Sequence, residues 1–494
     1  MISQKIVVIG AGISGFSAAA KLMENGFNDI VILEAENRTG GRIHSIPHGN
    51  GFIDLGAQWC HGQGRNVIYE LVSKHFAFGD TGLEDNDSVF YQSTGKLAKQ
   101  AQCVKLATLS ESILDEYTQM EKFNGSLGDF FVIKYRESLK SSNYNTIPIE
   151  LTNQMLDYTH KNVVYDFASP TWFDISAKLN ALSVGTTGKQ LLTWKTFGFK
   201  TAFDYITVSF FLKVLQNSNN CWFNLQKKLP PGSHFLNVEA KIHLNKEVTN
   251  IKYNQSSSQD KVYVSCSDGS IYAADHVIFT ASLGVLKARH ETLFTPKLPA
   301  AKVKAIENLG FGTLGKVFLE FDKPFWPTNN SVFVAYSLLW TDETLKNIKT
   351  TDRAWLIDIN SFIIVDGFPN ILETLISGRK MAEFEALSDT KIIDDCTWLL
   401  ESFLNRTIPR PKIMTRTRWL TNNNFLGSYS YHSMATEISK VSPSDLAKSI
   451  LSSTNKPTIL FAGEATDLKF SSYANGAVES GWRAGNELAA YLRK

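Results

Sequence analysis

A lysine opens an apolar stretch in the middle of the chain, where residues 312–326 read GTLGKVFLEFDKPFW. With a period of two residues, Val317, Leu319 and Phe321 line one face of a predicted strand, and Lys316 lies on the other. A lysine at this place is most often a solvated strand end. In a buried strand it would instead be desolvated, which disfavours the ammonium and lets the side chain position water or relay a proton.

Three glycines near the N-terminus have the spacing of a dinucleotide-binding turn. Gly10, Gly12 and Gly15 form G-x-G-x-x-G between a predicted strand and a predicted helix, and a second strand ends at Glu34. Such a turn lets the backbone approach a pyrophosphate at the helix N-terminus, where free N–H groups and the helix dipole favour negative charge. Glu34 would accept hydrogen bonds from the ribose hydroxyls. NAD and FAD both use this motif, so it does not distinguish them.

The residues that follow distinguish FAD from NAD. EAENRTGGR at 34–42 and DLGAQW at 54–59 resemble the E-A-x-x-R-x-G-G-R and D-x-G-A-x-W segments of the flavin-containing amine oxidase family. Later segments of the family are matched at residues 246–287, 417–431 and 460–492. The resemblance implies FAD as the cofactor, and a non-covalent one because residues 470–476 hold no cysteine.

The resemblance also assigns cofactor contacts residue by residue. In the family, the residue that matches Val248 meets the adenine through its backbone, and the one that matches Glu464 contacts the ribityl–phosphate portion. A helix that begins near Asn475 would point its N-terminus at the pyrimidine edge of the flavin, where its dipole stabilises negative charge. The full implied set is Gly10, Ala11, Gly12, Ser14, Gly15, Glu34, Ala35, Gly41, Arg42, Gly56, Ala57, Trp59, Val248, Trp419, Gly463, Glu464 and Ala474.

Lys316 is the predicted catalytic residue. It matches a lysine in the G-x-x-x-K-[IV] strand of the polyamine oxidase branch, which sits near flavin N5 and holds a water molecule. The implied reaction takes a hydride from the carbon next to a neutral amine nitrogen. The resulting imine is hydrolysed to an aldehyde and a smaller amine, and dioxygen reoxidises the flavin to give hydrogen peroxide.

Three residues are predicted to bind the substrate. His61 stands in a W-x-H-G segment that resembles animal-type polyamine oxidases, and we expect it to titrate near neutral pH and hydrogen-bond a distal amine. Tyr429 and Tyr473 match the aromatic pair that flanks the substrate in the family. A polyamine cation also calls for a carboxylate. The sequence leaves this carboxylate open among Asp174, Asp204 and Glu479.

Two residues depart from the pattern of the polyamine oxidases. Asn475 and Asp467 stand where relatives usually carry histidine. The sequence therefore does not predict which polyamine is preferred. A flavin oxidase with another amine substrate, and a catalytically silent FAD-binding protein, stay open as alternatives.

The predicted fold class is α/β, with the two-domain flavin amine oxidase fold. A Rossmann-like FAD-binding domain would be assembled from three separated stretches, and a substrate-binding domain of mixed sheet and helices from two. The predicted ranges are 1–80, 232–292 and 416–494 for the FAD-binding domain, and 81–231 and 293–415 for the substrate-binding domain.

The composition fits a globular enzyme that acts on small molecules. The 494 residues include 50 Lys+Arg and 48 Asp+Glu, a balance that argues against a nucleic-acid surface or a polybasic membrane anchor. The five cysteines lack C-x-x-C spacing, which argues against a metal site or a disulfide framework. We see no secretory signal, transmembrane run or S-K-L address, and expect a cytoplasmic location. The expected partners are a polyamine and dioxygen, with neither nucleic acid nor membrane.

Overall fold

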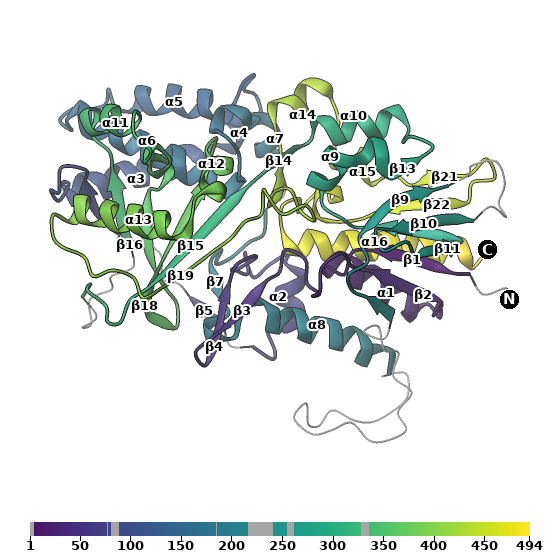
Figure 1. Cartoon of the computed structure of the whole chain (residues 1–494). Coiled ribbons are helices and arrows are strands. Elements are labelled where there is room, and N and C mark those ends of the chain that lie inside the picture. The colour runs from purple at the N-terminus through teal and green to yellow at the C-terminus, as the bar shows by residue number, and fades with distance from the viewer. Residues whose placement is uncertain are drawn as a thin grey trace. The chain divides into compact units, whose positions relative to one another are not determined.

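The computed structural model describes residues 4–76, 78–80, 88–183, 185–215, 241–253, 261–327 and 335–494 (Figure 1). The chain divides into two compact units. The first comprises residues 1–78, 185–307 and 442–494, and the second comprises 79–184 and 308–441. Cys221 lies outside the described residues. The polar segment NQSSSQD at 254–260, which is typical of a hairpin tip, also lies outside them.

The two units depart in places from the predicted domain ranges. Residues 185–215 and 293–307, predicted for the substrate-binding domain, lie in the first unit. Residues 79–80 and 416–441, predicted for the FAD-binding domain, lie in the second. Each of these segments is assigned to the unit with which it makes most of its contacts. The assignment of one unit to FAD and the other to substrate stays a proposal.

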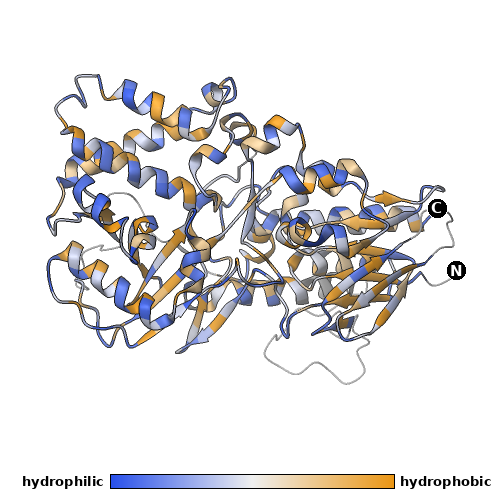
Figure 2. Cartoon of the chain, turned by 45° about the horizontal axis from the view of Figure 1, so that its top comes forward, coloured by the Kyte–Doolittle hydropathy of each residue, from blue (hydrophilic) through white to orange (hydrophobic). Residues whose placement is uncertain are grey.

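The first unit is built on a six-stranded sheet in the order β21-β22-β12-β1-β2-β8. Neighbouring strands are parallel except for β21 at the edge, which is antiparallel to β22. The inner strands are continuous apolar runs, drawn in orange near the two termini in Figure 2, as expected for a parallel sheet covered on both faces. The strands are β1 (Ile6–Ile9), β2 (Ile30–Leu33), β8 (Ile242–His243), β12 (His276–Phe279), β21 (Ile450–Leu451) and β22 (Pro457–Phe461).

Helices and a second sheet complete this unit. The four-stranded sheet has the order β11-β10-β9-β13, and its first three strands form antiparallel pairs. Its strands are β9 (Val248–Lys252), β10 (Val262–Cys266), β11 (Ile271–Ala274) and β13 (Phe294–Thr295), beside the hairpin of β3 (Ser45–His48) and β4 (Gly51–Asp54). The helices are α1 (Ile13–Glu24), α2 (Val67–Val72), α8 (Gly198–Leu215), α9 (Leu283–Leu293), α10 (Ala300–Asn308), α15 (Pro443–Ala447) and α16 (Ala474–Leu492).

Helices α1 and α16 approach each other more closely than side chains would allow. A Cβ atom added at Gly481 would lie 2.3 Å from the Ser14 carbonyl oxygen, and one added at Gly485 would lie 2.8 Å from that of Ala18. The hydroxyls of Ser14 and Ser480 lie 3.2 Å apart across the same contact. The C-terminal helix is thereby fixed against the helix that follows the glycine-rich turn, as Figure 1 shows for the two elements.

The second unit contains a six-stranded sheet in the order β19-β15-β18-β17-β16-β6. Strand β15 carries Lys316, and its neighbours β18 and β19 both run antiparallel to it. The strands are β6 (Ser88–Gln92), β15 (Leu314–Glu320), β16 (Ala335–Leu339), β17 (Ser361–Val365), β18 (Phe368–Ser377) and β19 (Ile413–Arg416), with β14 (Gly310–Gly312) and β20 (Tyr429–Tyr431) as a separate pair. The helices are α3 (Gln100–Leu114), α4 (Tyr117–Met120), α5 (Leu127–Ser138), α6 (Ile149–Phe167), α7 (Ala177–Ala181), α11 (Asp342–Ile348), α12 (Met381–Ala386), α13 (Asp389–Leu404) and α14 (Met434–Ser439).

The predicted alternation along β15 is confirmed. Val317, Leu319 and Phe321 are at most 1% exposed and pack into one apolar cluster with residues of β18 and α13. Lys316, on the opposite face, is also buried. The strand is therefore not solvated where the lysine stands.

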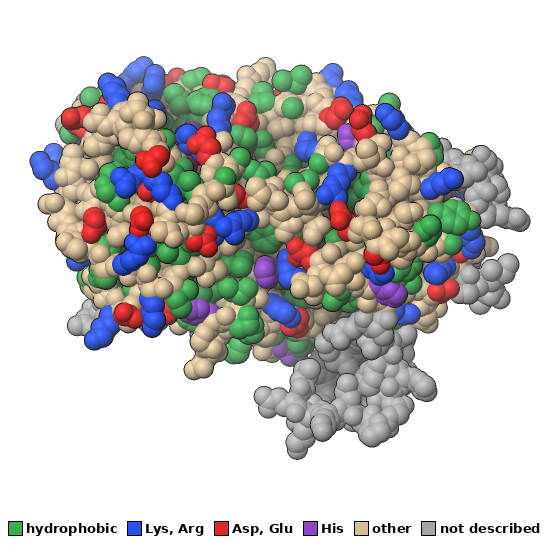
Figure 3. Space-filling view, in the orientation of Figure 1, with side chains coloured by type: hydrophobic (Ala, Val, Ile, Leu, Met, Phe, Trp, Pro, Cys, Tyr) green, Lys and Arg blue, Asp and Glu red, His purple; other side chains and the backbone are tan. Residues whose placement is uncertain are grey.

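Surface chemistry is mixed on the face drawn in Figure 3, where Lys and Arg side chains alternate with Asp and Glu. The cysteines among the described residues, Cys60, Cys103, Cys266 and Cys396, are free and buried. Among the helices that the structure describes, none has the length and apolar character to cross a membrane.

The contact between α1 and α16 generates a first prediction. Gly481→Ala should lower the free energy of unfolding by about 1–3 kcal/mol, because its methyl group has no room beside the Ser14 carbonyl. Gly185→Ala is the matched control, since a Cβ there would meet nothing within 4 Å. Denaturant unfolding of both variants measures the difference, and equal stability of the two would contradict the packing described.

Candidate cofactor and catalytic sites

The turn between β1 and α1 has no space for side chains. Gly10 has a φ of +104°, and a Cβ added at Gly15 would lie 2.0 Å from the Gly10 carbonyl oxygen. Gly12 is the N-cap of α1 and supplies no side chain to its first turn, which also carries no acidic residue. The first N–H groups of α1 are therefore available to an anion, and the helix dipole favours negative charge there.

Glu34 stands at the end of β2, next to this turn. Its carboxylate accepts the Ala11 N–H at 2.7 Å and the Glu36 N–H at 2.9 Å, and it is 7% exposed. Burial raises the pKa of Glu34, while the two backbone donors act in the opposite direction. These bonds orient the carboxylate, and its remaining lone pairs can accept the hydroxyls of a ribose.

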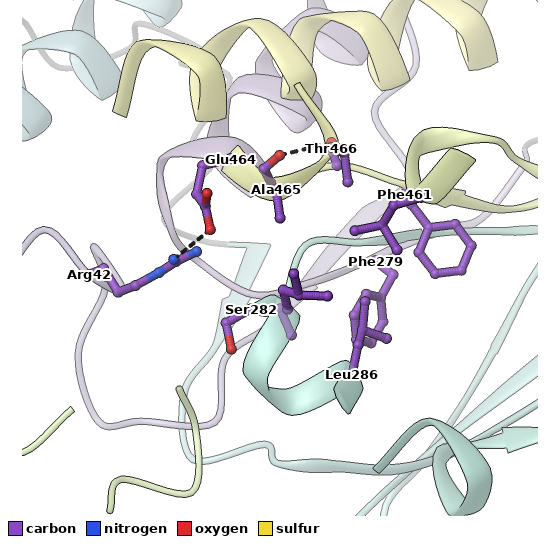
Figure 4. Close-up of a pocket in the computed structure, with 13 residues that line it drawn as sticks. Arg42, Phe279, Ser282, Leu286, Phe461, Glu464, Ala465 and Thr466 are labelled. Carbon is purple, nitrogen blue, oxygen red and sulfur yellow. Dashed lines mark hydrogen bonds and ion pairs between the residues drawn. The ribbon is translucent and has the colours of Figure 1, made fainter. Parts of the chain in front are cut away.

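Arg42 and Glu464 form an ion pair at 2.8 Å, although 422 residues separate them in the chain (Figure 4). The second carboxylate oxygen of Glu464 accepts the Ser472 N–H at 2.9 Å. A pocket beside the pair is lined by four stretches of the chain, which contribute Arg42, Ser282, Leu446 and Phe461 among others. Two residues predicted separately as cofactor contacts are therefore brought together.

Close backbone contacts also surround Arg42. A Cβ added at Gly56 would lie 1.9 Å from the Arg42 carbonyl oxygen, which also accepts the Ala57 N–H at 3.1 Å. Gly41 has a φ of +60° and Gly463 one of +121°. The predicted residues Gly41, Arg42, Gly56, Ala57, Gly463 and Glu464 all lie in the first unit, as do Ala35, Trp59, Val248 and Ala474.

The N-terminus of α16 holds a buried polar group without a partner. Asn475 is 2% exposed, and its Nδ2 meets no hydrogen-bond acceptor within the described residues. The N-cap residue, Tyr473, supplies no side-chain cap to the helix. Asp467, which precedes this helix, stabilises the local backbone, since its carboxylate accepts the N–H groups of Lys469 and Phe470. An unpaired buried donor is costly, and an acceptor on a bound ligand would remove that cost.

These features together fit a dinucleotide such as FAD. The cradle of glycines admits a pyrophosphate, Glu34 offers acceptors to a ribose, and Asn475 offers a donor at the helix where the flavin ring is predicted. Trp419, also predicted to contact the cofactor, is buried in the second unit with its ring 5.1 Å from that of Phe425. Its contact with FAD stays a prediction.

His61 lies in an aromatic group of the first unit. Its ring centroid is 5.2 Å from that of Tyr473 and 6.3 Å from that of Trp59, both edge-on. Desolvation lowers the pKa of His61 to about 4. The expectation that this histidine titrates near neutral pH is therefore wrong. A neutral imidazole can accept a hydrogen bond from an ammonium group, which is the contact that amine binding would use.

Lys316 has a partner that the sequence analysis missed. Its Nζ lies 3.7 Å from Glu373 Oε1 on β18, and the two side chains are 4% and 2% exposed. The backbone of Lys316 is held by Thr417, whose Oγ1 accepts the lysine N–H at 2.9 Å. The sequence does carry an indication of this partner, because Glu373 is an acidic residue inside the apolar run ILETLIS at 371–377. The motif around Lys316 does not include that run.

Tyr429 leads to a second missed residue. Its hydroxyl donates to the Tyr165 carbonyl oxygen at 2.7 Å, at the C-terminus of α6. The next residue is Asp166, whose side chain is exposed while the surrounding protein desolvates it and raises its pKa to about 7. An exposed carboxylate can receive a cationic ligand, and a cation stabilises its charged form.

The three carboxylates considered from the sequence have other surroundings. Asp204 forms an ion pair with Lys200 at 2.6 Å on α8, and both side chains are exposed. Glu479 is half-buried on α16, and desolvation raises its pKa. Asp174 lies near Tyr431 and contributes to the raised pKa of that phenol. None of these contacts involves Tyr429.

A profile of the family described as flavin containing amine oxidoreductase matches residues 13–183 and 233–489. The chain belongs to this family. As an FAD-dependent amine oxidase, it has the cofactor and the enzyme class that the motifs predicted.

Individual comparisons agree with this amine oxidase assignment. The peroxisomal N(1)-acetyl-spermine/spermidine oxidase of Homo sapiens is 28% identical over 520 residues, which is 98% of this chain and 94% of the relative. The enzyme of the same name from Bos taurus is 28% identical over 519 residues, with the same coverage. A solved structure of a redesigned putrescine oxidase superposes with a TM-score of 0.66 at 15% identity, covering 99% of each chain. The predicted fold class is confirmed.

The predicted cytoplasmic location of this amine oxidase is wrong. Both mammalian relatives that span nearly the whole chain are named peroxisomal. The prediction relied on composition and on the lack of a recognised address. A targeting signal is a short segment read by a receptor, so neither composition nor core packing reveals it.

The unpaired amide of Asn475 generates a prediction for this oxidase. Asn475→Ala should weaken FAD binding about fivefold, the effect of one lost hydrogen bond, while the apoprotein keeps or gains stability. Titration of the apoprotein with FAD, followed by flavin fluorescence, measures the dissociation constant. Asn25→Ala, at the C-terminal end of α1, is the control, since the Asn25 amide already donates to the Lys21 carbonyl. Unchanged FAD affinity in Asn475→Ala would contradict the assigned contact.

Proposed function

We propose that this amine oxidase acts on polyamines, namely spermine, spermidine or their N-acetylated forms. It would oxidise the carbon next to a secondary amine and give an aldehyde, a smaller amine and hydrogen peroxide. The names of the mammalian relatives support this substrate class. The structural observation that carries the proposal is the position of Asp166, one residue beyond the carbonyl that Tyr429 bonds.

FAD, when bound, accepts a hydride from the amine and passes two electrons to dioxygen. We propose that it binds without a covalent link, because residues 470–476 contain no cysteine. Glu34, Arg42 and Glu464 would hold its ribose and phosphate portions, by the contacts described above.

The protein's part in the reaction is to select and orient the amine. The reacting nitrogen must be neutral, since its lone pair assists the departure of hydride. We expect the rings of Tyr429 and Tyr473 to contact the cation, because an aromatic ring attracts a cation without fixing it in a salt bridge. His61, neutral at physiological pH, would accept an N–H from the amine, and Asp166 would face a distal ammonium. Lys316 would hold the water that takes part in proton transfer.

The proposal is tested by mixing the holoenzyme anaerobically with spermine, spermidine, N1-acetylspermine and a monoamine in turn. Stopped-flow absorbance follows the bleaching of the flavin. Fast bleaching by a polyamine, with slow or no bleaching by the monoamine, is the expected result. Preference for the monoamine would indicate another amine substrate. A flavin that no amine bleaches would indicate an FAD-binding protein without turnover.

Removal of the Asp166 charge should affect the oxidation of polyamines and monoamines differently. We expect Asp166→Asn to lower kcat/KM for a polyamine about 10- to 100-fold, the range for one hydrogen bond to a charged group, and to leave a monoamine unaffected. Asp204→Asn, which removes a solvated carboxylate on α8, is the matched control. An equal loss for both amines would contradict the substrate contact.

The pH dependence gives an independent measure of the same group. Because the pKa of Asp166 is raised to about 7, its carboxyl is neutral below that pH and charged above it. The ratio of kcat/KM between the wild type and Asp166→Asn should therefore rise through pH 7 and approach one at acidic pH. Taking the ratio cancels the protonation of the polyamine itself.

A further inference from the structure

A buried carboxylate faces Lys316 from the adjacent strand. In the antiparallel pairing of β15 and β18, Lys316 lies opposite Leu375, and Phe318 lies opposite Glu373. Glu373 is two residues from Leu375, so its side chain projects from the same face of the sheet as Lys316. The Nζ and Oε1 atoms are 3.7 Å apart, and neither side chain is more than 4% exposed.

Packing alone gives no reason for an acidic residue at this position. The neighbours of Glu373 along β18, from Ile371 to Ile376, are otherwise apolar or threonine, and all but Leu375 are buried. Removing a carboxylate from water costs several kcal/mol unless an opposite charge or hydrogen bonds compensate it. Lys316 supplies such a charge, and Glu373 does the same for Lys316.

Other charged groups lie near this face of the sheet. Helix α6 covers the face, as its contacts with β16 and β18 and the 3.2 Å approach of the Tyr158 and Ser337 hydroxyls indicate. On α6, Lys161 and Asp157 pair at 2.7 Å, while Asp166 stands at the C-terminal end of the helix. On β15 itself, Glu320 shares the face of Lys316 and accepts the Asn370 amide at 3.4 Å.

We propose that Glu373 is the positioning residue of Lys316, and that its carboxylate keeps the lysine as an ammonium in the reacting enzyme. The inference rests on the proposed role of Lys316. Glu373 Oε1 lies 3.7 Å from the ammonium nitrogen, and at this distance in a buried setting its negative charge stabilises the ammonium. The ammonium can then direct its N–H groups to the reaction water.

The charge of the Lys316 side chain determines whether it can act as a proton donor or as a base. Reduction of dioxygen to hydrogen peroxide consumes two electrons, delivered from the amine by way of the cofactor, and two protons. An ammonium donates a hydrogen bond and a proton in that half-reaction, whereas a neutral lysine would serve as a base toward the amine. Burial favours the neutral lysine, and the opposite charge of Glu373 favours the ammonium.

The test compares four holoenzymes: wild type, Glu373→Gln, Lys316→Met and the double variant. Stopped flow measures the rate at which reduced flavin is reoxidised by dioxygen between pH 6 and 9. We expect Glu373→Gln to slow reoxidation at least tenfold and to add a dependence on pH, whereas the same change made in Lys316→Met should alter the rate less than twofold. Glu373→Asp should recover most of the rate, and Glu320→Gln, on the same face, should leave the profile unchanged.

The outcomes separate the two claims. If Lys316→Met reoxidises as fast as the wild type and turns over amines normally, the proposed role of the lysine fails. If Lys316→Met is slow but Glu373→Gln is unchanged, or if Glu373→Gln slows both backgrounds equally, the positioning role of Glu373 is overturned.

Unfolding of the apoproteins gives a readout independent of activity. Loss of Glu373 should lower the unfolding temperature far more in the wild type than in Lys316→Met, because only the wild type has a buried ammonium for the lost carboxylate to compensate. Should Glu373→Gln fail to fold, a folded double variant would support the charge pair. Failure of both to fold would overturn it.

Discussion

The first unit depends on close approach of main chain to main chain around the turn that follows β1. An added Cβ at Gly15, Gly56 or Gly481 would lie 2.3 Å or less from the carbonyl oxygen of Gly10, Arg42 or Ser14 respectively. These contacts close the glycine-rich turn, join the loop after β4 to the Arg42 segment, and hold the C-terminal helix against α1. The N–H groups, the Glu34 carboxylate and the Arg42–Glu464 pair are thereby concentrated in one unit, although the segments are hundreds of residues apart.

Buried charge is handled differently in the two units. In the first unit, Glu34 is held by backbone donors and Glu464 by an arginine and a backbone donor, so both carboxylates are oriented for polar ligand groups. In the second unit, Lys316 and Glu373 lie inside a sheet and compensate each other across two strands. In both units the cost of burying these charges is thus offset by backbone donors or by an opposite charge.

Burial also changes the chemistry of groups that look alike in sequence. His61 is kept neutral because desolvation disfavours the imidazolium, although a histidine in water titrates near pH 6.5. Asp166 and Asp204 are both aspartates on helices, yet one is desolvated and the other forms a solvated pair with Lys200. A residue type therefore limits the possible roles, and the surrounding atoms select among them.

The amino-acid sequence by itself determined the glycine-rich turn, the acidic residue Glu34 that follows β2 and the alternation of β15, because these features depend on neighbours within a few residues. It also determined the family, through motifs of local spacing. Only the tertiary structure joined Arg42 to Glu464, Lys316 to Glu373 and Tyr429 to the end of α6. These pairs arise from strand register and helix packing between distant segments, which local periodicity does not encode. The desolvation of a side chain also depends on the tertiary structure, since the atoms that exclude water from it come from every part of its unit.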